Sequence, residues 1–288
     1  MDVVAAMKAL EAAGSEPTRK TYTRHGVTGP QFGVTTAALG KLAKQVGADT
    51  ALALELWRTA NHDARVLATM VADVATLALT DLDLWGREVS NKAVADAVGT
   101  LAARVSSAKE TLLGWTKSPD EWIGRAGWTG ISAMVMAPGT FEELELDGFI
   151  SSLEKGIHRT KNNVKDARLC LLITIGGLSD TLETRALAVA RRIGPIDVDH
   201  GDTACETPDP LTTIPKTRAH RRAKEQKASR EKKPASSAAA KSGKESAAKG
   251  SRAPAVAKVP AAVKGPVAAK APVAAKAPKS VAKASRAR

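Results

Sequence analysis

Apolar residues recur at helical spacing along most of the chain, and the segment 54–73 shows the pattern most clearly. Its second half carries an apolar stripe at i, i+3, i+4 and i+7, made of Ala64, Leu67, Ala68 and Val71. This spacing is that of one face of an α-helix. Asn61 stands before the stripe as an N-cap, and Thr59 and Ala60 end the apolar helix that precedes it. The segment therefore predicts two antiparallel helices joined by a short hinge.

The same pattern repeats on both sides of this segment. Further amphipathic helices are predicted at residues 2–13, 34–46, 77–89, 91–105, 106–115, 119–136, 142–155, 163–175 and 181–193. No convincing strand and no glycine-rich phosphate loop interrupts them. Helix pairs that repeat about every 35–45 residues are typical of HEAT-like units. We therefore predict an all-α, HEAT-like α-solenoid of stacked antiparallel helix pairs.

The helical pattern ends before residue 196, and two different segments follow it. Residues 196–213 are acidic and rich in turn-forming residues, and we expect an extended strap lying over the last helices. Residues 214–288 are rich in Lys, Ala and Pro, which cannot bury a core, so a disordered basic tail is predicted there. Its first part, 216–233, is compatible with a helix in a bound state. The predicted folded domain is thus 1–213.

The positive charge of the chain is concentrated in the tail. Residues 214–288 contain 21 Lys and Arg against 3 acidic residues, whereas residues 1–213 contain 22 against 27. The tail resembles that of linker histones, and a segment of this kind binds duplex DNA without sequence preference by releasing counterions. The alternative is a solubilising linker, which does not require charge of one sign. We therefore expect the tail to hold the phosphate backbone of duplex DNA.

Several classes of protein do not fit the composition. Two cysteines make no disulfide framework, no apolar stretch reaches the roughly 18 residues of a membrane span, and the first residues read as an ordinary helix rather than a secretion signal. Aromatic residues make up 3% of the chain, which argues against a stacking platform for single-stranded nucleic acid. We expect a cytoplasmic, nucleoid-associated monomer with no membrane partner and no cofactor.

The predicted strap contains residue types that bind metals. They are Asp197, Asp199, His200, Asp202 and Cys205. One His and one Cys at irregular spacing do not make a zinc site, so no metal is expected. We expect the acidic and glycine residues to shape turns and His200 to bond to backbone groups.

Four stretches of the chain together carry a resemblance to a known family. They are LELWRTANHDARVLATMVAD, DEWIGRAGW, NNVKDARLCLLITIG and VDHGDTACETPD. Together they resemble the DNA alkylation repair proteins of the AlkD-like, HEAT-repeat type, over residues 1–210. The resemblance implies an alkylpurine DNA glycosylase, which hydrolyses the N-glycosidic bond of cationic N3- or N7-alkylated purines in duplex DNA. It also implies that the concave face of the solenoid holds the duplex.

The resemblance also suggests roles for individual residues. Asp96 matches the catalytic aspartate of the family, and Arg125 matches its DNA-contacting arginine. The two positions where the family carries aromatic residues hold Lys92 and Cys170 here. An alternative reading of Asp96 is a solvated carboxylate paired with Lys92 one turn earlier.

Other polar residues on the predicted helices are candidate contacts to DNA. They are His62 and Arg65 on one stripe, Lys161, Lys165 and Arg168 on another, Lys92, and Trp122 one turn before Arg125. Each is equally compatible with an ordinary solvated or structural residue. The remaining tryptophans are expected in the core.

Two further functions stay open: a non-catalytic DNA-binding protein tethered by its tail, and a protein-interaction solenoid.

Overall fold

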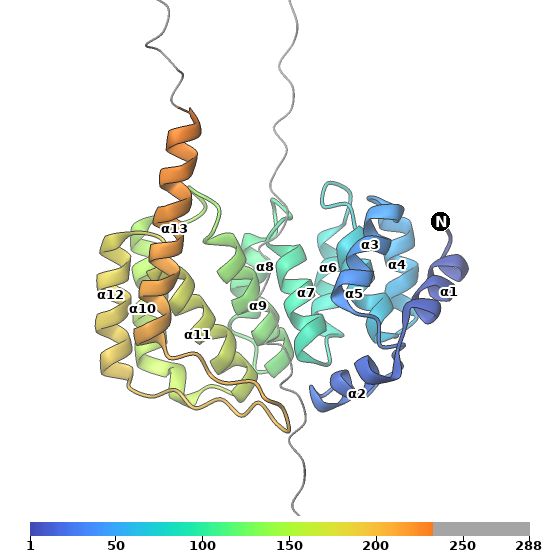
Figure 1. The fold of residues 1–288 in the computed structure, drawn as a ribbon, viewed down its shortest axis with the longest axis horizontal. Helices are drawn as coiled ribbons and strands as arrows, with labels where there is room; N and C mark the ends of the chain where they lie inside the picture. Colours follow the sequence, from blue (N-terminus) through green and yellow to red (C-terminus); the bar gives the residue numbers. More distant parts are fainter. Residues whose placement is uncertain (233–288) are drawn as a thin grey trace, which may run out of the picture. The chain divides into compact units, whose positions relative to one another are not determined.

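The computed structural model describes residues 1–232, and the helices in this range confirm the predicted all-α solenoid (Figure 1). The helices are α1 (Val3–Ala13), α2 (Glu16–Arg24), α3 (Thr36–Val46), α4 (Thr50–Arg58), α5 (His62–Val71), α6 (Leu79–Arg87), α7 (Lys92–Ala102), α8 (Lys109–Trp115), α9 (Glu121–Met134), α10 (Glu143–Gly156), α11 (Asn162–Gly176), α12 (Asp180–Ile193) and α13 (Pro210–Lys232). A short 3-10 helix, η1 (Ile157–Arg159), precedes α11. No strand longer than the isolated bridge between Gly14 and Val34 occurs within residues 1–232.

The pair α4–α5 forms as its sequence pattern predicts. The Asn61 side chain caps α5 by accepting hydrogen bonds from the backbone N–H groups of Asp63 and Ala64. The hinge residue Ala60 has a φ of 55°, the left-handed conformation that allows the chain to reverse between two helices. The predicted apolar stripe of α5 is completely buried: Ala64, Leu67, Ala68 and Val71.

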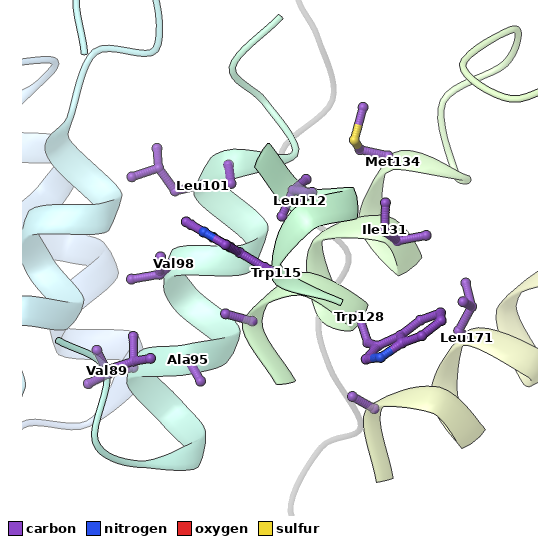
Figure 2. Packing of buried hydrophobic residues seen from close by; sticks show 14 of the residues in the cluster. Val89, Ala95, Val98, Leu101, Leu112, Trp115, Trp128, Ile131, Met134 and Leu171 are labelled. Carbon is purple, nitrogen blue, oxygen red and sulfur yellow. The ribbon is translucent and has the colours of Figure 1, made fainter. Parts of the chain in front are cut away.

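A continuous hydrophobic core runs through the stacked helices. The rings of Trp57 and Trp85 stack with their centroids 4.5 Å apart, which joins α4 to α6. Figure 2 shows Trp115 pointing from α8 towards Val98 and Leu101 of α7. Trp128 likewise points from α9 towards α11. Four of the five tryptophans are therefore core residues, as expected.

Helices α7 and α9 cross with almost no space between their backbones. A Cβ atom at Gly99 would lie 2.2 Å from the carbonyl oxygen of Ala126 and 3.0 Å from the amide nitrogen of Gly130. Only glycine allows this approach, because a side chain of any size would overlap the opposite backbone. The crossing brings the neighbouring residues Asp96 and Arg125 within direct reach of each other.

The strap runs from Gly194 to Asp209 without regular secondary structure and is fastened to the start of α11. The Lys165 ammonium donates to the Asp197 carbonyl at 3.0 Å. Asn162 exchanges two hydrogen bonds with the backbone of Asp199. His200 bonds the Thr207 hydroxyl rather than the backbone groups that the sequence suggested.

The boundary predicted between residues 213 and 214 is wrong. Helix α13 begins at Pro210, inside the predicted strap, and continues to Lys232. It packs on α11 and α12 through the completely buried Ile214 and an ion pair between Arg218 and Asp180. Residues 214–232 therefore continue a helix whose first turns are anchored on the folded body by Ile214 and Arg218. The predicted disorder of 233–288 lies outside the described residues.

Within residues 1–232, no helix has the length and apolar character needed to cross a membrane.

Candidate functional site

Asp96 and Arg125 form the centre of the candidate site. The Arg125 guanidinium on α9 donates from Nε to Asp96 Oδ1 and from Nη2 to Asp96 Oδ2, both at 2.8 Å. The Thr129 hydroxyl, one turn later on α9, donates to the same Oδ1 at 2.9 Å. A fork of two parallel charge-assisted bonds fixes the carboxylate in orientation as well as in position.

A second carboxylate holds Arg125 from the other side. Arg125 Nη1 donates to Asp166 Oδ2 on α11 and to the carbonyl oxygen of Asn163, both at 2.9 Å. Lys92 Nζ on α7 donates to the same Asp166 oxygen at 2.7 Å. Lys92, Asp96, Arg125 and Asp166 thus make one network of two cations and two anions, which we call the polar cluster.

The members of the polar cluster differ strongly in exposure. The side chains of Arg125 and Asp166 are 4% and 7% exposed, whereas those of Asp96 and Lys92 are 35% and 39% exposed. The buried pair therefore forms the base of the cluster, and one carboxylate and one ammonium reach solvent. The buried Arg125 guanidinium therefore lies beneath the partly exposed Asp96 carboxylate.

The charges within the cluster support one another electrostatically. Burial alone lowers the pKa of Arg125, but Asp96 and Asp166 outweigh burial, and the pKa is raised above its ordinary value. Burial alone raises the pKa of Asp166, but Lys92 and Arg125 outweigh it and hold the pKa below its ordinary value. Asp166 is therefore kept charged in a place where an isolated carboxylate would be protonated, and the buried charge of Arg125 is compensated by its two carboxylate partners.

The face that carries the cluster continues along α9 and α11. One turn beyond Asp166 lies Cys170, and Thr174 follows, where its hydroxyl lies 3.1 Å from that of Ser132 on α9. The Cys170 side chain reaches solvent, but the surrounding protein and the negative charge of Asp166 raise the pKa of its thiol to about 11. A neutral thiol therefore lies beside the cluster at neutral pH. We call this polar surface of α9 and α11 the inner face.

The expectation that Arg125 contacts phosphate must be corrected. Its three guanidinium nitrogens already donate to Asp96, Asp166 and the Asn163 carbonyl, and its side chain is buried. It lies beneath Asp96 and holds that carboxylate by two hydrogen bonds. Lys92 is partly exposed but is likewise bound to Asp166.

His62 and Arg65 do not form the free cationic stripe that the sequence suggested. His62 is buried against the Tyr22 ring with centroids 4.8 Å apart, and burial lowers its pKa, so it is held neutral. The Arg65 guanidinium lies 4.8 Å over the Trp57 ring and donates to the carbonyl and carboxylate of Glu88. Both residues join helices in the core, because their stripe faces neighbouring helices rather than solvent.

The second expected stripe divides between two faces of α11. Lys161 is exposed and donates to the Pro119 carbonyl at 2.8 Å, and Lys165 fastens the strap. Arg168 is buried on the opposite side, 5.0 Å over the Trp128 ring and 2.7 Å from the Ser152 carbonyl, so its guanidinium is used within the fold. Trp122 is half-buried against the core, one turn before Arg125.

The sequence interpretation missed Asp166, although a signal was present. Helix α11 is apolar on most of its circumference, with Leu169, Leu171, Leu172, Ile173 and Ile175 all buried. An Asp within such a helix has to be paired, because an isolated carboxylate in the interior is strongly unfavourable. Within the described part of the chain, no three His, Cys, Asp or Glu residues come together in a way that could hold a metal ion.

Comparison with known proteins relates this chain to one protein family and to one solved HEAT-like structure. The family described as "DNA alkylation repair enzyme" matches residues 6–192. Uncharacterized proteins of Listeria monocytogenes and Listeria innocua are each 24% identical over 216 residues, covering 73% of this chain and 94% of their own. A solved structure described as a new family of proteins related to the HEAT-like repeat DNA glycosylases, with affinity for branched DNA structures, is 27% identical. It superimposes with a TM-score of 0.71 over 77% of this chain and 96% of that chain, which confirms the HEAT-like architecture.

Proposed function

Because this chain belongs to the DNA alkylation repair enzyme family, we propose that it releases cationic N3- or N7-alkylated purines from duplex DNA by hydrolysing the N-glycosidic bond. Asp96 is the residue that supports the reaction, and Arg125 and Asp166 are the residues that position it. Lys92, one turn from Asp96 and 39% exposed, is the residue that we assign to a phosphate of the bound strand.

One observation carries this proposal: Asp96 is the exposed end of a rigid ion pair. The Arg125 guanidinium is buried and the Asp96 carboxylate is partly exposed, so the pair presents its negative end to solvent. Lys92, one turn away on α7, forms its ion pair with Asp166 and not with Asp96, so its ammonium does not pair with the reacting carboxylate. A charge fixed before the substrate arrives stabilises a transition state without further reorganisation.

The chemistry requires little beyond this charge. An alkylated purine is a cation and leaves as a neutral base when the C1′–N bond breaks, so no general acid is needed. The deoxyribose then carries oxocarbenium-like positive charge, which Asp96 stabilises, and water adds at C1′ and gives up a proton to solvent. These steps use only groups on the exposed edge of the polar cluster.

A second function has its own supporting observation. Lys92 and Cys170 occupy the positions where the resemblance expects aromatic residues, so no aromatic ring from these positions packs against a lesion. The structural relative is described as having affinity for branched DNA structures. The alternative is therefore a non-catalytic DNA-binding protein, in which the polar cluster is structural.

Single-turnover release of N7-methylguanine from methylated duplex DNA separates the two functions. We expect the wild type to release the base and Asp96→Asn to lose release by at least about a hundredfold, the size of effect seen for one electrostatic group. Asp147→Asn is a matched control, because Asp147 is also 35% exposed and paired with an arginine, Arg185 on α12. Absence of release from the wild type, with DNA binding intact, would overturn the glycosylase proposal in favour of the binding protein.

A further inference from the structure

Helix α13 is docked on the body by one of its faces. Ile214 is completely buried against Gly176 of α11. Arg218 and Arg222 both reach Asp180 at the start of α12, at 2.7 and 2.6 Å. The ion pairs of Arg218 and Arg222 with Asp180 therefore fasten α13 to α12.

The other face of α13 carries cations that have no such role. Lys216, His220, Lys224 and Lys227 follow one another at i, i+4, i+8 and i+11, so they form one stripe. All four are exposed, and within residues 1–229 none of them makes an ion pair or a side-chain hydrogen bond. The stripe is about 16 Å long, from the helical rise of 1.5 Å per residue. We call it the outer stripe.

The docking position places α13 at the end of the inner face. Thr217 packs against Gly177, at the C-terminal end of α11, and Arg221 contacts the sulfur of Met136 just after α9. The polar cluster lies at the N-terminal ends of the same two helices. Figure 1 shows α13 crossing α11 and extending beyond the ends of the neighbouring helices. Asp166 and Gly177 are separated by about 16 Å along α11.

We propose that the outer stripe of α13 binds the phosphate backbone of DNA that is held at the polar cluster, an inference that rests on the proposed action on DNA. Duplex DNA carries one negative charge per about 1.7 Å of its axis, so about nine charges span the distance from the cluster to α13. Without α13 and the segment after it, residues 1–213 contain 27 acidic against 22 basic residues, so the net charge of this part of the body does not attract DNA. A stripe of one sign at the edge of the inner face supplies this attraction locally.

The exposed charges alone do not show that the outer stripe binds DNA, because an ordinary solvated helix face carries similar charges. Binding to phosphates releases counterions, and this release makes the affinity depend on salt concentration. We would measure the affinity of the full chain for undamaged duplex DNA between 50 and 200 mM salt. The variant Lys216→Gln/Lys224→Gln/Lys227→Gln removes three phosphate contacts, and the slope of log affinity against log salt should decrease by about 2.7. The affinity of the wild type should then fall about 40-fold more than that of the variant over this range.

A matched variant shows whether the effect belongs to α13. Lys8→Gln/Lys41→Gln/Lys44→Gln removes the same charge from exposed positions on α1 and α3, and its slope should remain that of the wild type. Both variants keep residues 233–288, so any contribution of that segment is common to them. Equal slopes for the two triple variants would overturn the proposal. A reduced slope without release of N7-methylguanine would overturn only the glycosylase proposal, and release with an unchanged slope would overturn only the role of α13.

Discussion

Asp96 and Arg125 are joined by two parallel hydrogen bonds of 2.8 Å across the crossing of α7 and α9. The arginine is buried and also bound to Asp166, so three helices meet at one guanidinium. The same residue therefore stabilises the fold and fixes the orientation of the exposed carboxylate. We therefore expect a substitution at Arg125 to lower the free energy of unfolding, whether or not the protein catalyses a reaction.

Replacing the guanidinium should strongly destabilise the protein. Arg125→Met keeps much of the side-chain volume but leaves Asp166 in the interior with only Lys92 as its partner. Breaking a buried ion pair in this way typically lowers the free energy of unfolding by about 3–5 kcal/mol. Urea denaturation of the variant and the wild type would measure this loss. Arg185→Met removes two exposed ion pairs, with Glu143 and Asp147, and should cost about 1 kcal/mol or less. Similar losses for the two variants would show that the polar cluster contributes no more than a surface pair.

The contribution of Asp166 should depend on pH in a defined direction. Its pKa is lower in the folded protein than its ordinary value of 3.8, so the charged carboxylate stabilises the fold above that value. This stabilisation should be lost as the pH falls through the lower pKa of the folded state. In urea denaturation, Asp166→Asn should be less stable than the wild type at pH 5–7, and the difference should shrink below about pH 4. A difference that stays constant down to pH 3 would contradict this account.

The sequence predicted the helices well because their apolar stripes are local. The i, i+3, i+4, i+7 stripe of α5 and its Asn61 cap depend only on neighbouring residues, and both are present. The partners of polar residues could not be predicted in this way, because they depend on which helices cross. The alternative reading of Asp96 paired its carboxylate with Lys92, one turn away, but the crossing at Gly99 gives Asp96 the partner Arg125, and Lys92 binds Asp166.

The role of Arg65 gives a direct test of the same point. The sequence suggested a contact with DNA, whereas the structure places its guanidinium between Trp57 and Glu88. Arg65→Gln should therefore lower the free energy of unfolding by about 1–2 kcal/mol through the lost cation–π contact and hydrogen bonds. Its salt slope for binding duplex DNA should remain that of the wild type. Arg58→Gln, at an exposed position of α4, is the control and should leave stability unchanged. A reduced salt slope with unchanged stability for Arg65→Gln would restore the original expectation.

The close crossing of α7 and α9 predicts an unusual sensitivity to a single methyl group. Alanine normally favours a helix over glycine by about 0.8–1 kcal/mol. In Gly99→Ala, however, the new Cβ would lie 2.2 Å from the Ala126 carbonyl, so the helices must move apart. We expect a net loss of about 1–3 kcal/mol, the usual cost of overpacking, and weaker release of N7-methylguanine because Asp96 and Arg125 separate. Gly148→Ala on α10 is the matched control, since its Cβ would meet no atom within 4 Å, and it should be neutral or slightly stabilising. Equal stability of the two variants would show that α7 and α9 separate without cost and that their contact does not fix the polar cluster.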